Sequence, residues 1–268
     1  MTVVAPVLSM RSAGLTLGGR RLWSGLDLDV DAGEFIAVLG ANGSGKTSLL
    51  KAVLGVHPLT EGSAAILGEP VRRGDRRIGY VPQRIHPEDG AALRARDLVG
   101  FGVDGHRWGP GMPGARRRRV DALLREVGAE ASARTPVAHL SGGELQRLRI
   151  GQALAGDPRL LLCDEPLSSL DLRAQRTVSD LIDLRRRERW FGVVFVTHDI
   201  NPVLAHVDRV LYLAGGRFRI GTPEDVLRSD VLSELYDAPV DVIRTRDRIV
   251  IAGAPDDSHA HDHGEGAA

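Results

Sequence analysis

The chain has 268 residues, and its 35 Lys and Arg balance its 35 Asp and Glu, so it has no global basic field for binding nucleic acid. No apolar run approaches the length of a bilayer span and the N-terminus lacks a signal-peptide core, so we expect a soluble, intracellular protein. The length suits one large domain with an inserted subdomain. Cys163 is the single cysteine, and its apolar surroundings predict an inert core residue.

Short alternating segments open the chain and predict antiparallel strands. Residues 15–17 and 26–30 alternate in this way, and the pair Gly18-Gly19 predicts a tight turn between them. The run 34–39 is almost continuously apolar instead, which is typical of a strand buried on both faces of a parallel sheet.

A glycine-rich stretch follows that buried strand and opens a helix that should stop at Gly55. Its glycines allow a tight turn whose N–H groups approach phosphate oxygens, and the helix N-terminus adds partial positive charge. Lys46 is expected to reach the β- and γ-phosphates, and the Thr47 hydroxyl to bind Mg²⁺. The stretch predicts an ATP-binding loop formed by Gly40, Ala41, Asn42, Gly43, Ser44, Gly45, Lys46 and Thr47.

Strand signals return at 64–67 and 78–81 and then vanish between about 90 and 140. A helix is expected there, starting at the four arginines 116–119, which form either a solvated face or a contact for an acidic or phosphate partner. Its apolar residues recur at helical spacing and give one stripe: Val120, Leu123, Leu124 and Val127.

Alternating strands and helices resume after residue 150 and imply a parallel α/β sheet interrupted by a helical insertion. The apolar run 160–163 delivers Asp164 and Glu165 to the carboxyl edge of that sheet, where ligands of such folds bind. We expect Asp164 to hold Mg²⁺ and Glu165 to polarise the attacking water. His198 follows the next buried strand and is predicted to sense the γ-phosphate; Gln83 is expected to contact Mg²⁺ or water with its amide oxygen.

Residues 141–144, Ser-Gly-Gly-Glu, match a capping box at a helix start, and such a start can also bind an anion. With this second phosphate-binding surface, the chain resembles the ATP-binding subunits of ABC transporters. The resemblance covers roughly residues 8–225 in family order: Walker A at 40–47, Q-loop at Gln83, signature at 140–144, Walker B at 160–165, D-loop at 168–171 and switch histidine at His198.

The resemblance implies an α/β P-loop NTPase fold: a mostly parallel core sheet, an N-terminal antiparallel β subdomain and an inserted α-helical subdomain. The ATPase domain would span 1–254, with the helical insertion at about 84–150, followed by a flexible His-containing tail at 255–268. It further implies a head-to-tail homodimer that sandwiches ATP between Lys46 of one subunit and the signature of the other. Ser141, Gly142, Gly143 and Asp171 would then belong to the ATP site.

One position departs from the family pattern. Family members usually place an adenine-stacking aromatic residue where this chain has Leu17, so weaker apolar contact is expected, with Trp23 as a possible substitute.

The implied function is a peripheral ATPase on the cytoplasmic face of the cell membrane, which powers separate integral membrane permease subunits and works indirectly with an extracytoplasmic solute-binding protein. The segments 81–84 and 232–240 resemble ATPases of metal-ion and iron-chelate importers, and His259, His261 and His263 resemble the histidine-rich segments of zinc and manganese uptake systems. Zinc or a related divalent metal is therefore the predicted solute. Imidazole ligands also suit a weak zinc site in the tail, which otherwise serves as a solubilising segment.

Other functions stay open at this point. An iron-siderophore or cobalamin importer, or a two-component exporter, would use a similar chain. A soluble ABC ATPase without a permease usually carries a long coiled coil or a second ATPase copy, and the sequence has neither. A P-loop kinase or GTPase is opposed by the signature and by the position of Glu165 directly after Asp164.

Overall fold

The computed structural model of the chain describes residues 5–83, 93–105, 113–245 and 248–253. A six-stranded sheet lies at its centre with strand order β10-β9-β3-β8-β7-β6, and every neighbouring pair except β10–β9 is parallel. Its strands are β3 Phe35–Gly40, β6 Ile78–Val81, β7 Leu160–Asp164, β8 Gly192–Val196, β9 Arg209–Ala214 and β10 Arg217–Gly221.

A second, antiparallel sheet has the order β2-β1-β4-β5. Gly18 and Gly19 turn the chain between its first two strands with φ of 57° and 80°, a conformation in which most residues with a Cβ are strained. The predicted hairpin is thereby confirmed. The strands are β1 Leu8–Leu17, β2 Arg20–Val30, β4 Glu61–Ile66 and β5 Glu69–Pro70.

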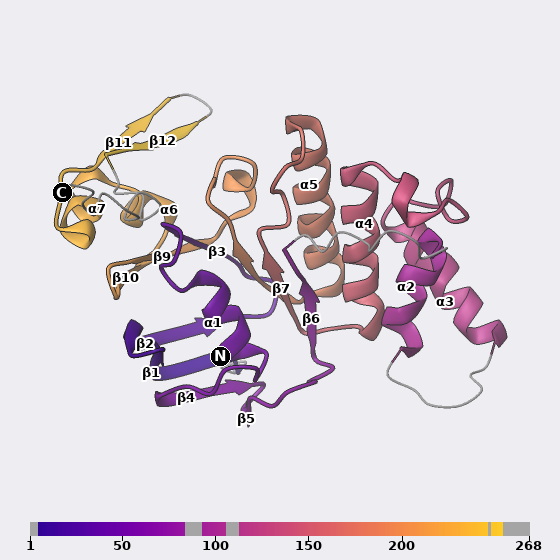
Figure 1. Cartoon of the computed structure of the whole chain (residues 1–268), viewed down its shortest axis with the longest axis horizontal. Helices are drawn as coiled ribbons and strands as arrows, with labels where there is room; N and C mark the ends of the chain where they lie inside the picture. Colours follow the sequence, from indigo (N-terminus) through magenta and orange to yellow (C-terminus); the bar gives the residue numbers. More distant parts are fainter. Residues whose placement is uncertain (1–4, 84–92, 106–112, 246–247, 254–268) are drawn as a thin grey trace, which may run out of the picture.

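Most of the longer helices connect strands of the central sheet along the chain: α2, α3 and α4 lie between β6 and β7 in the sequence, and α5 lies between β7 and β8. Figure 1 shows α5, α4, α2 and α3 side by side at the right-hand end of the molecule, and the antiparallel sheet with α1 at the lower left. The longer helices are α1 Lys46–Val53, α2 Ala95–Asp104, α3 Pro113–Glu126, α4 Gly142–Ala153, α5 Leu172–Arg189, α6 Pro223–Val226 and α7 Ser229–Tyr236. The described residues also form the short 3₁₀ turns η1 Val137–His139, η2 Leu154–Gly156 and η3 Leu204–His206. A hairpin pairs β11 Asp241–Arg244 with β12 Ile249–Ala252.

The central strands are buried on both faces because each face packs against its own hydrophobic cluster. In β3, Phe35 and Ala37 join the cluster on the helical side, whereas Ile36 and Val38 join the cluster shared with α1 and the antiparallel sheet. Cys163 of β7 is fully buried in the helical-side cluster, and burial raises the pKa of its thiol. These contacts explain why the strands read as continuous apolar runs.

The inserted helices pack against the helical side of the sheet. The predicted stripe on α3 is confirmed, since all four of its residues are almost fully buried: Val120, Leu123, Leu124 and Val127. The helix begins at Pro113, three residues before the expected start at Arg116. Arg116 pairs with Asp104 at 2.7 Å and Arg119 with Asp157 at 2.7 Å, so part of the arginine run is held by acidic residues of the same chain.

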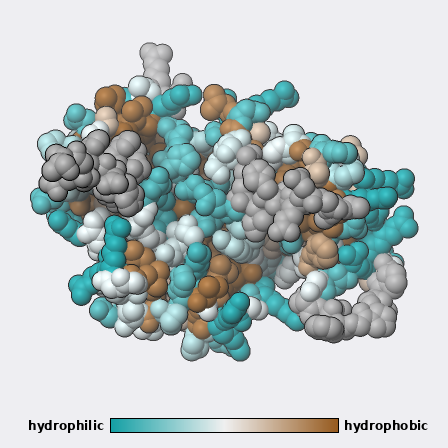
Figure 2. Space-filling view, in the orientation of Figure 1, coloured by the Kyte–Doolittle hydropathy of each residue, from teal (hydrophilic) through white to brown (hydrophobic). Residues whose placement is uncertain are grey.

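The predicted fold class is confirmed in each of its parts: the mostly parallel core sheet, the antiparallel β subdomain and the helical insertion. The β11–β12 hairpin is not among the elements that the sequence predicts. Among the described residues, no helix combines the length and the apolarity that a bilayer crossing requires. On the face shown in Figure 2, hydrophobic side chains form separate patches between hydrophilic ones. The proposed limit at residue 254 stays a prediction, because 254–268 lie outside the described part.

Candidate active site

The loop between β3 and α1 is shaped by its glycines. Gly40, Gly43 and Gly45 have φ of 141°, 77° and 97°, all in the region that favours glycine. A Cβ on Gly40 would stand 2.1 Å from the backbone oxygen of Leu213 in β9, so no larger residue fits there. The loop therefore lies directly against the edge of the central sheet.

Two polar side chains of the loop are buried beneath it. The ammonium of Lys46 donates to the carbonyl oxygens of Gly40 at 2.7 Å and Ala41 at 2.9 Å. Burial lowers the pKa of Lys46, and the carboxylates of Glu165 and Asp164 partly oppose this shift. The Ser44 hydroxyl is also buried and has no hydrogen-bond partner in the part of the chain that the structure describes. A buried hydroxyl of this kind is costly unless a ligand or water completes it.

Asp164 is the last residue of β7, and its carboxylate accepts hydrogen bonds from two neighbouring elements. The Thr47 hydroxyl at the start of α1 donates to its Oδ1 at 2.9 Å, and the Tyr80 hydroxyl of β6 donates to its Oδ2 at 3.3 Å. Burial, followed by the charge of Asp164, raises the pKa of Tyr80 to about 12. Asp164 and Thr47, which the sequence singled out separately, thus meet; Tyr80 was missed because its contact depends on the pairing of β6 with β7.

Glu165 meets two other residues that the sequence singled out. Gln83 donates from Nε2 to Glu165 Oε2 at 3.1 Å, and His198 Nδ1 lies 3.8 Å from the same oxygen. The three residues follow the adjacent strands β6, β7 and β8, which run parallel, so their side chains emerge at one edge. Glu165 has φ of 44°, a costly conformation for a residue with a Cβ and one that concentrates at functional sites.

Ser141 caps the N-terminus of α4 with the predicted capping box. Its hydroxyl accepts from the Glu144 amide, and its own amide donates to Glu144 Oε2 at 3.0 Å. The Ser132 hydroxyl donates to Glu144 Oε1 at 2.7 Å. The hydroxyls of Ser132 and Ser141, with the Ser141 amide, lower the pKa of Glu144 to about 2. Ser132 lies nine residues before Ser141, and no local pattern predicts its contact.

The signature segment and the phosphate loop line different hollows of the molecule. Ser141, Gly142 and Gly143 line a hollow of about 470 Å³ together with Asp171, whose carboxylate caps α5 by accepting from the Ala174 amide at 2.8 Å. The hollow beside the phosphate loop, about 380 Å³ in volume, has no lining residue in common with it. Within one chain, the described structure therefore keeps the signature segment and the phosphate loop in two separate hollows.

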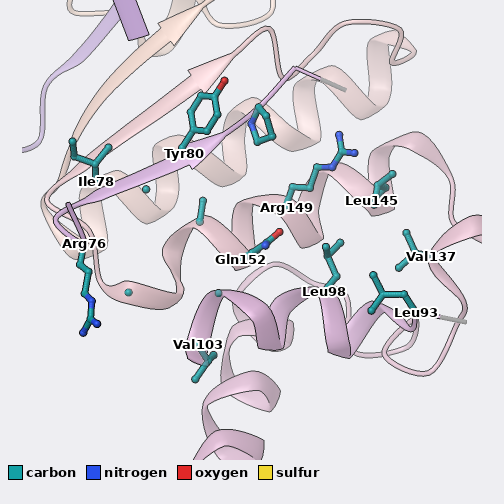
Figure 3. Close-up of a pocket in the computed structure, with 15 residues that line it drawn as sticks. Arg76, Ile78, Tyr80, Leu93, Leu98, Val103, Val137, Leu145, Arg149 and Gln152 are labelled. Atoms are coloured by element: carbon teal, nitrogen blue, oxygen red, sulfur yellow. The ribbon is translucent and has the colours of Figure 1, made fainter. Parts of the chain in front are cut away.

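A mostly apolar groove of about 710 Å³ lies between the edge strand β6 and the inserted helices. Figure 3 shows Ile78 and Tyr80 on the strand side, Leu98 and Val103 on α2, and Leu145 on α4 around it. Pro82 also lines the groove, one residue before Gln83. The groove thus lies next to the residue that contacts Glu165.

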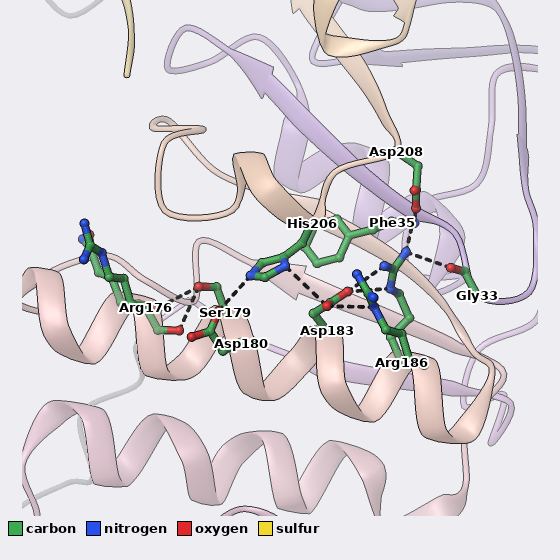
Figure 4. Close-up of polar contacts among 11 residues, drawn as sticks. Gly33, Phe35, Arg176, Ser179, Asp180, Asp183, Arg186, His206 and Asp208 are labelled. Carbon is green, nitrogen blue, oxygen red and sulfur yellow. Dashed lines mark hydrogen bonds and ion pairs between the residues drawn. The ribbon is translucent and has the colours of Figure 1, made fainter. Parts of the chain in front are cut away.

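An ion-pair network centred on the buried side chains of Asp183 and Arg186 holds the segment after β8 to helix α5 (Figure 4). His206 lies 2.9 Å from Asp180 and 3.3 Å from Asp183. Arg186 pairs with Asp183 and Asp208, each at 2.6 Å, and lies over the ring of Phe35. The segment that carries His198 is therefore fixed at its far end.

The expected metal site in the tail cannot be located in the structure. His259, His261 and His263 lie outside the described residues. Within the described ranges, no group of three or more His, Cys, Asp and Glu side chains could hold a metal ion.

The glycine-rich loop 40–47 holds a buried lysine and lies at the same edge of the sheet as the carboxylates of Asp164 and Glu165. This arrangement defines a P-loop nucleoside triphosphatase. The capped N-terminus of α4, with its two glycines in a separate hollow, is typical of one family within that class. Residues 23–168 match the family model described as ABC transporter, which covers more than half of the chain. The chain belongs to the ABC transporter family, as one of its ATP-binding subunits, and is an ATPase.

Curated relatives match almost the whole chain. The zinc import ATP-binding protein ZnuC of Pseudomonas fluorescens is 32% identical over 268 residues, covering 97% of this chain and 97% of the relative. The protein of the same name from Paramagnetospirillum magneticum is 36% identical, with 97% and 90% covered.

Solved structures agree with the fold. A transporter assigned to the metal-chelate type of ABC transporter, in an inward-facing conformation, superposes with a TM-score of 0.78 at 28% identity, covering 92% of this chain and 96% of that one. The cbiO1 protein of Clostridium perfringens, part of the complex cbiONQ, gives 0.73 at 24% identity, with 86% and 94% covered.

Proposed function

We propose that this ATPase powers a separate membrane permease for the uptake of zinc or a related divalent metal ion. The observation that carries the ATPase part is the contact of Glu165 with both Gln83 and His198, next to the loop that holds Lys46. The zinc assignment is supported by relatives that are named for zinc import and match nearly the full length. A metal-chelate importer is the second candidate, because a transporter of that type is 28% identical.

The phosphate loop, residues 40–47, would hold the triphosphate of ATP. Lys46 supplies the positive charge, and the buried Ser44 hydroxyl supplies a polar group without a partner among the described residues. The N-terminus of α1 adds backbone donors and the positive end of the helix dipole.

The oxygen atoms around Asp164 fit Mg²⁺. Thr47 and Asp164 present a hydroxyl and a carboxylate within 2.9 Å of each other, and Gln83 adds an amide oxygen at the same sheet edge. Hard oxygen ligands of this kind are those that Mg²⁺ prefers, and the ion usually keeps several waters. When bound there, Mg²⁺ would neutralise part of the charge on the β- and γ-phosphates.

Glu165 would accept a proton from the water that attacks the γ-phosphate. Its carboxylate is oriented by the Gln83 amide and lies 3.8 Å from His198, which would contact the γ-phosphate. The orientation of Glu165 therefore depends on Gln83, so a movement at Gln83 would change how well Glu165 can act as a base.

The ATP-bound state would be a head-to-tail homodimer. Ser141, Gly142 and Gly143 line a hollow apart from the phosphate loop of the same chain, so a second subunit would bring them to the triphosphate. Asp171 lines the same hollow and would lie at this interface.

The permease would dock in the apolar groove between the sheet edge and the inserted helices. Pro82 lines the groove next to Gln83, so an inserted permease segment would act on the contact between Gln83 and Glu165. The subunit would then sit on the cytoplasmic face of the membrane, and an extracytoplasmic solute-binding protein would act through the permease.

The solute would be identified by reconstituting the ATPase with its permease and measuring ATP hydrolysis with each candidate. Zinc should stimulate hydrolysis more than an iron chelate or cobalamin at equal concentration. Leu98→Glu, which places a charge in the groove, should abolish the stimulation and leave the basal rate intact. Stimulation by the chelate alone would favour the second candidate, and stimulation by neither would contradict both.

A further inference from the structure

The hollow beside the phosphate loop is formed by segments that are far apart in the sequence. Ala41, Gly43 and Ser44 contribute from the loop, Leu22 from β2, and Tyr236 from the C-terminal end of α7. Its volume of about 380 Å³ lies within the range of small-molecule sites. A nucleotide whose triphosphate lies on this loop has to place its nucleoside close to one end of it.

The two residues that the sequence suggested for the nucleoside do not line this hollow. Leu17, at the end of β1, is half-buried and packs against the hydrophobic cluster under the antiparallel sheet. Trp23 is fully buried, and its ring atoms lie 3.1 Å from where a Cβ on Gly45 would stand. Trp23 thus supports the loop from below and has no exposed face for a base.

Tyr236 is held in place by packing on both sides of its helix. Leu232 and Leu235 are buried in the helical-side cluster, and Glu234 forms an ion pair with Arg219 of β10 at 2.5 Å. The Tyr236 hydroxyl lies 3.2 Å from the hydroxyl of Tyr212, and the two rings meet edge to face. The ring is half-buried, so part of it is exposed in the hollow.

Two arginines complete the polar side of the hollow. Arg20 and Arg21 follow the turn between β1 and β2, and both line it. A Cβ on Gly43 would stand 3.9 Å from Nη1 of Arg20, so this guanidinium lies beside the phosphate loop. An aromatic ring, an aliphatic side chain and guanidinium groups together suit a flat heteroaromatic base and a ribose.

We propose that Tyr236 forms the aromatic wall of the nucleoside-binding part of the ATP site, together with Leu22, Arg20 and Arg21. The inference rests on the proposed binding of the triphosphate at residues 40–47. It makes the C-terminal helix α7 part of the nucleotide site and gives this chain an aromatic contact that Leu17 cannot supply.

The test compares the binding of ATP and of inorganic tripolyphosphate to the full chain by calorimetry with Mg²⁺. Tyr236→Leu should weaken ATP binding roughly 5- to 150-fold, the range for losing one base–aromatic stack. Its affinity for tripolyphosphate should change less than about twofold, because the loop is untouched. Tyr236→Phe keeps the ring and should bind ATP like the wild type, as should Leu17→Ala.

Several outcomes would overturn the proposal. They are an unchanged ATP affinity in Tyr236→Leu, an equal loss for both ligands, or a loss in Leu17→Ala instead. Failure of the proposed phosphate site would look different: Lys46→Ala would leave the tripolyphosphate affinity of the chain unchanged.

Photolabelling of the wild type with 8-azido-ATP removes any dependence on the folding of a variant. The label is expected on the peptide that contains residues 229–236. Labelling confined to other peptides, such as the one with Leu17, would refute the assignment.

Discussion

Glu165→Gln should nearly abolish ATP hydrolysis while leaving ATP binding intact. The amide oxygen of the new residue can still accept from Gln83, whose Nε2 lies 3.1 Å from Glu165 Oε2, so the geometry of the sheet edge is kept. What is lost is the base, and removing a general base lowers the rate by about 10²- to 10⁴-fold. The activation barrier should therefore rise by about 3–5 kcal/mol.

Nucleotide affinity should not fall in this variant. Glu165 is one of two carboxylates whose charge acts on Lys46, and its loss removes negative charge close to the expected γ-phosphate position. Hydrolysis would be measured as phosphate release, and ATP binding by calorimetry. Glu188→Gln on α5, an exposed residue paired with Arg185, is the matched control and should retain normal turnover. Near-normal phosphate release by Glu165→Gln would refute the assignment of the base.

Ser141→Arg should block turnover because a bulky cation would fill the hollow lined by Ser141, Gly142 and Gly143. When this variant is mixed with Lys46→Ala, each heterodimer should trap nucleotide at about one site, because one of its two shared sites keeps both wild-type halves. Equal trapping by the mixture and both homodimers would contradict a shared site. Ser132→Ala should lower the free energy of unfolding by about 1 kcal/mol in urea titrations at neutral pH. The pKa of Glu144 is about 2 in the fold and 4.5 ordinarily, so the stability difference between Ser132→Ala and the wild type should be complete above pH 4.5 and fade as the pH falls towards 2. A stability difference that stays constant with pH would argue against a hydrogen bond from Ser132 to the ionised Glu144. Deleting the residues after Pro255 should leave basal hydrolysis intact, and heats of zinc binding identical to those of the full chain would exclude the tail as a metal site.

The fold and the phosphate loop were readable because their signals are local. A run such as 160–163 is apolar because both faces of its strand are covered, and the polar residues that follow it emerge at one edge of the sheet. The capping box at Ser141 is likewise contained within four residues. Patterns of this length need no knowledge of strand order.

The contacts that the sequence missed join elements that are distant along the chain. Tyr80 reaches Asp164 only because β6 pairs with β7 after the whole helical insertion. Tyr236 reaches the hollow at the phosphate loop nearly two hundred residues later, through the packing of α7 on the sheet. By residue type alone Trp23 is a candidate ligand contact, yet its burial depends on the packing of β2 beneath the loop.

Because Cys163 is buried, the unmodified sequence can serve as the starting protein for labelling at introduced surface cysteines. It is the chain's single cysteine, fully enclosed between sheet and helices, and its raised thiol pKa keeps it protonated and unreactive. Maleimide dyes or spin labels would therefore attach only to a cysteine introduced on the surface. One such cysteine near Ser141 and another near Asn42, in separate preparations, would allow the approach of two subunits to be followed by energy transfer without first replacing any core residue.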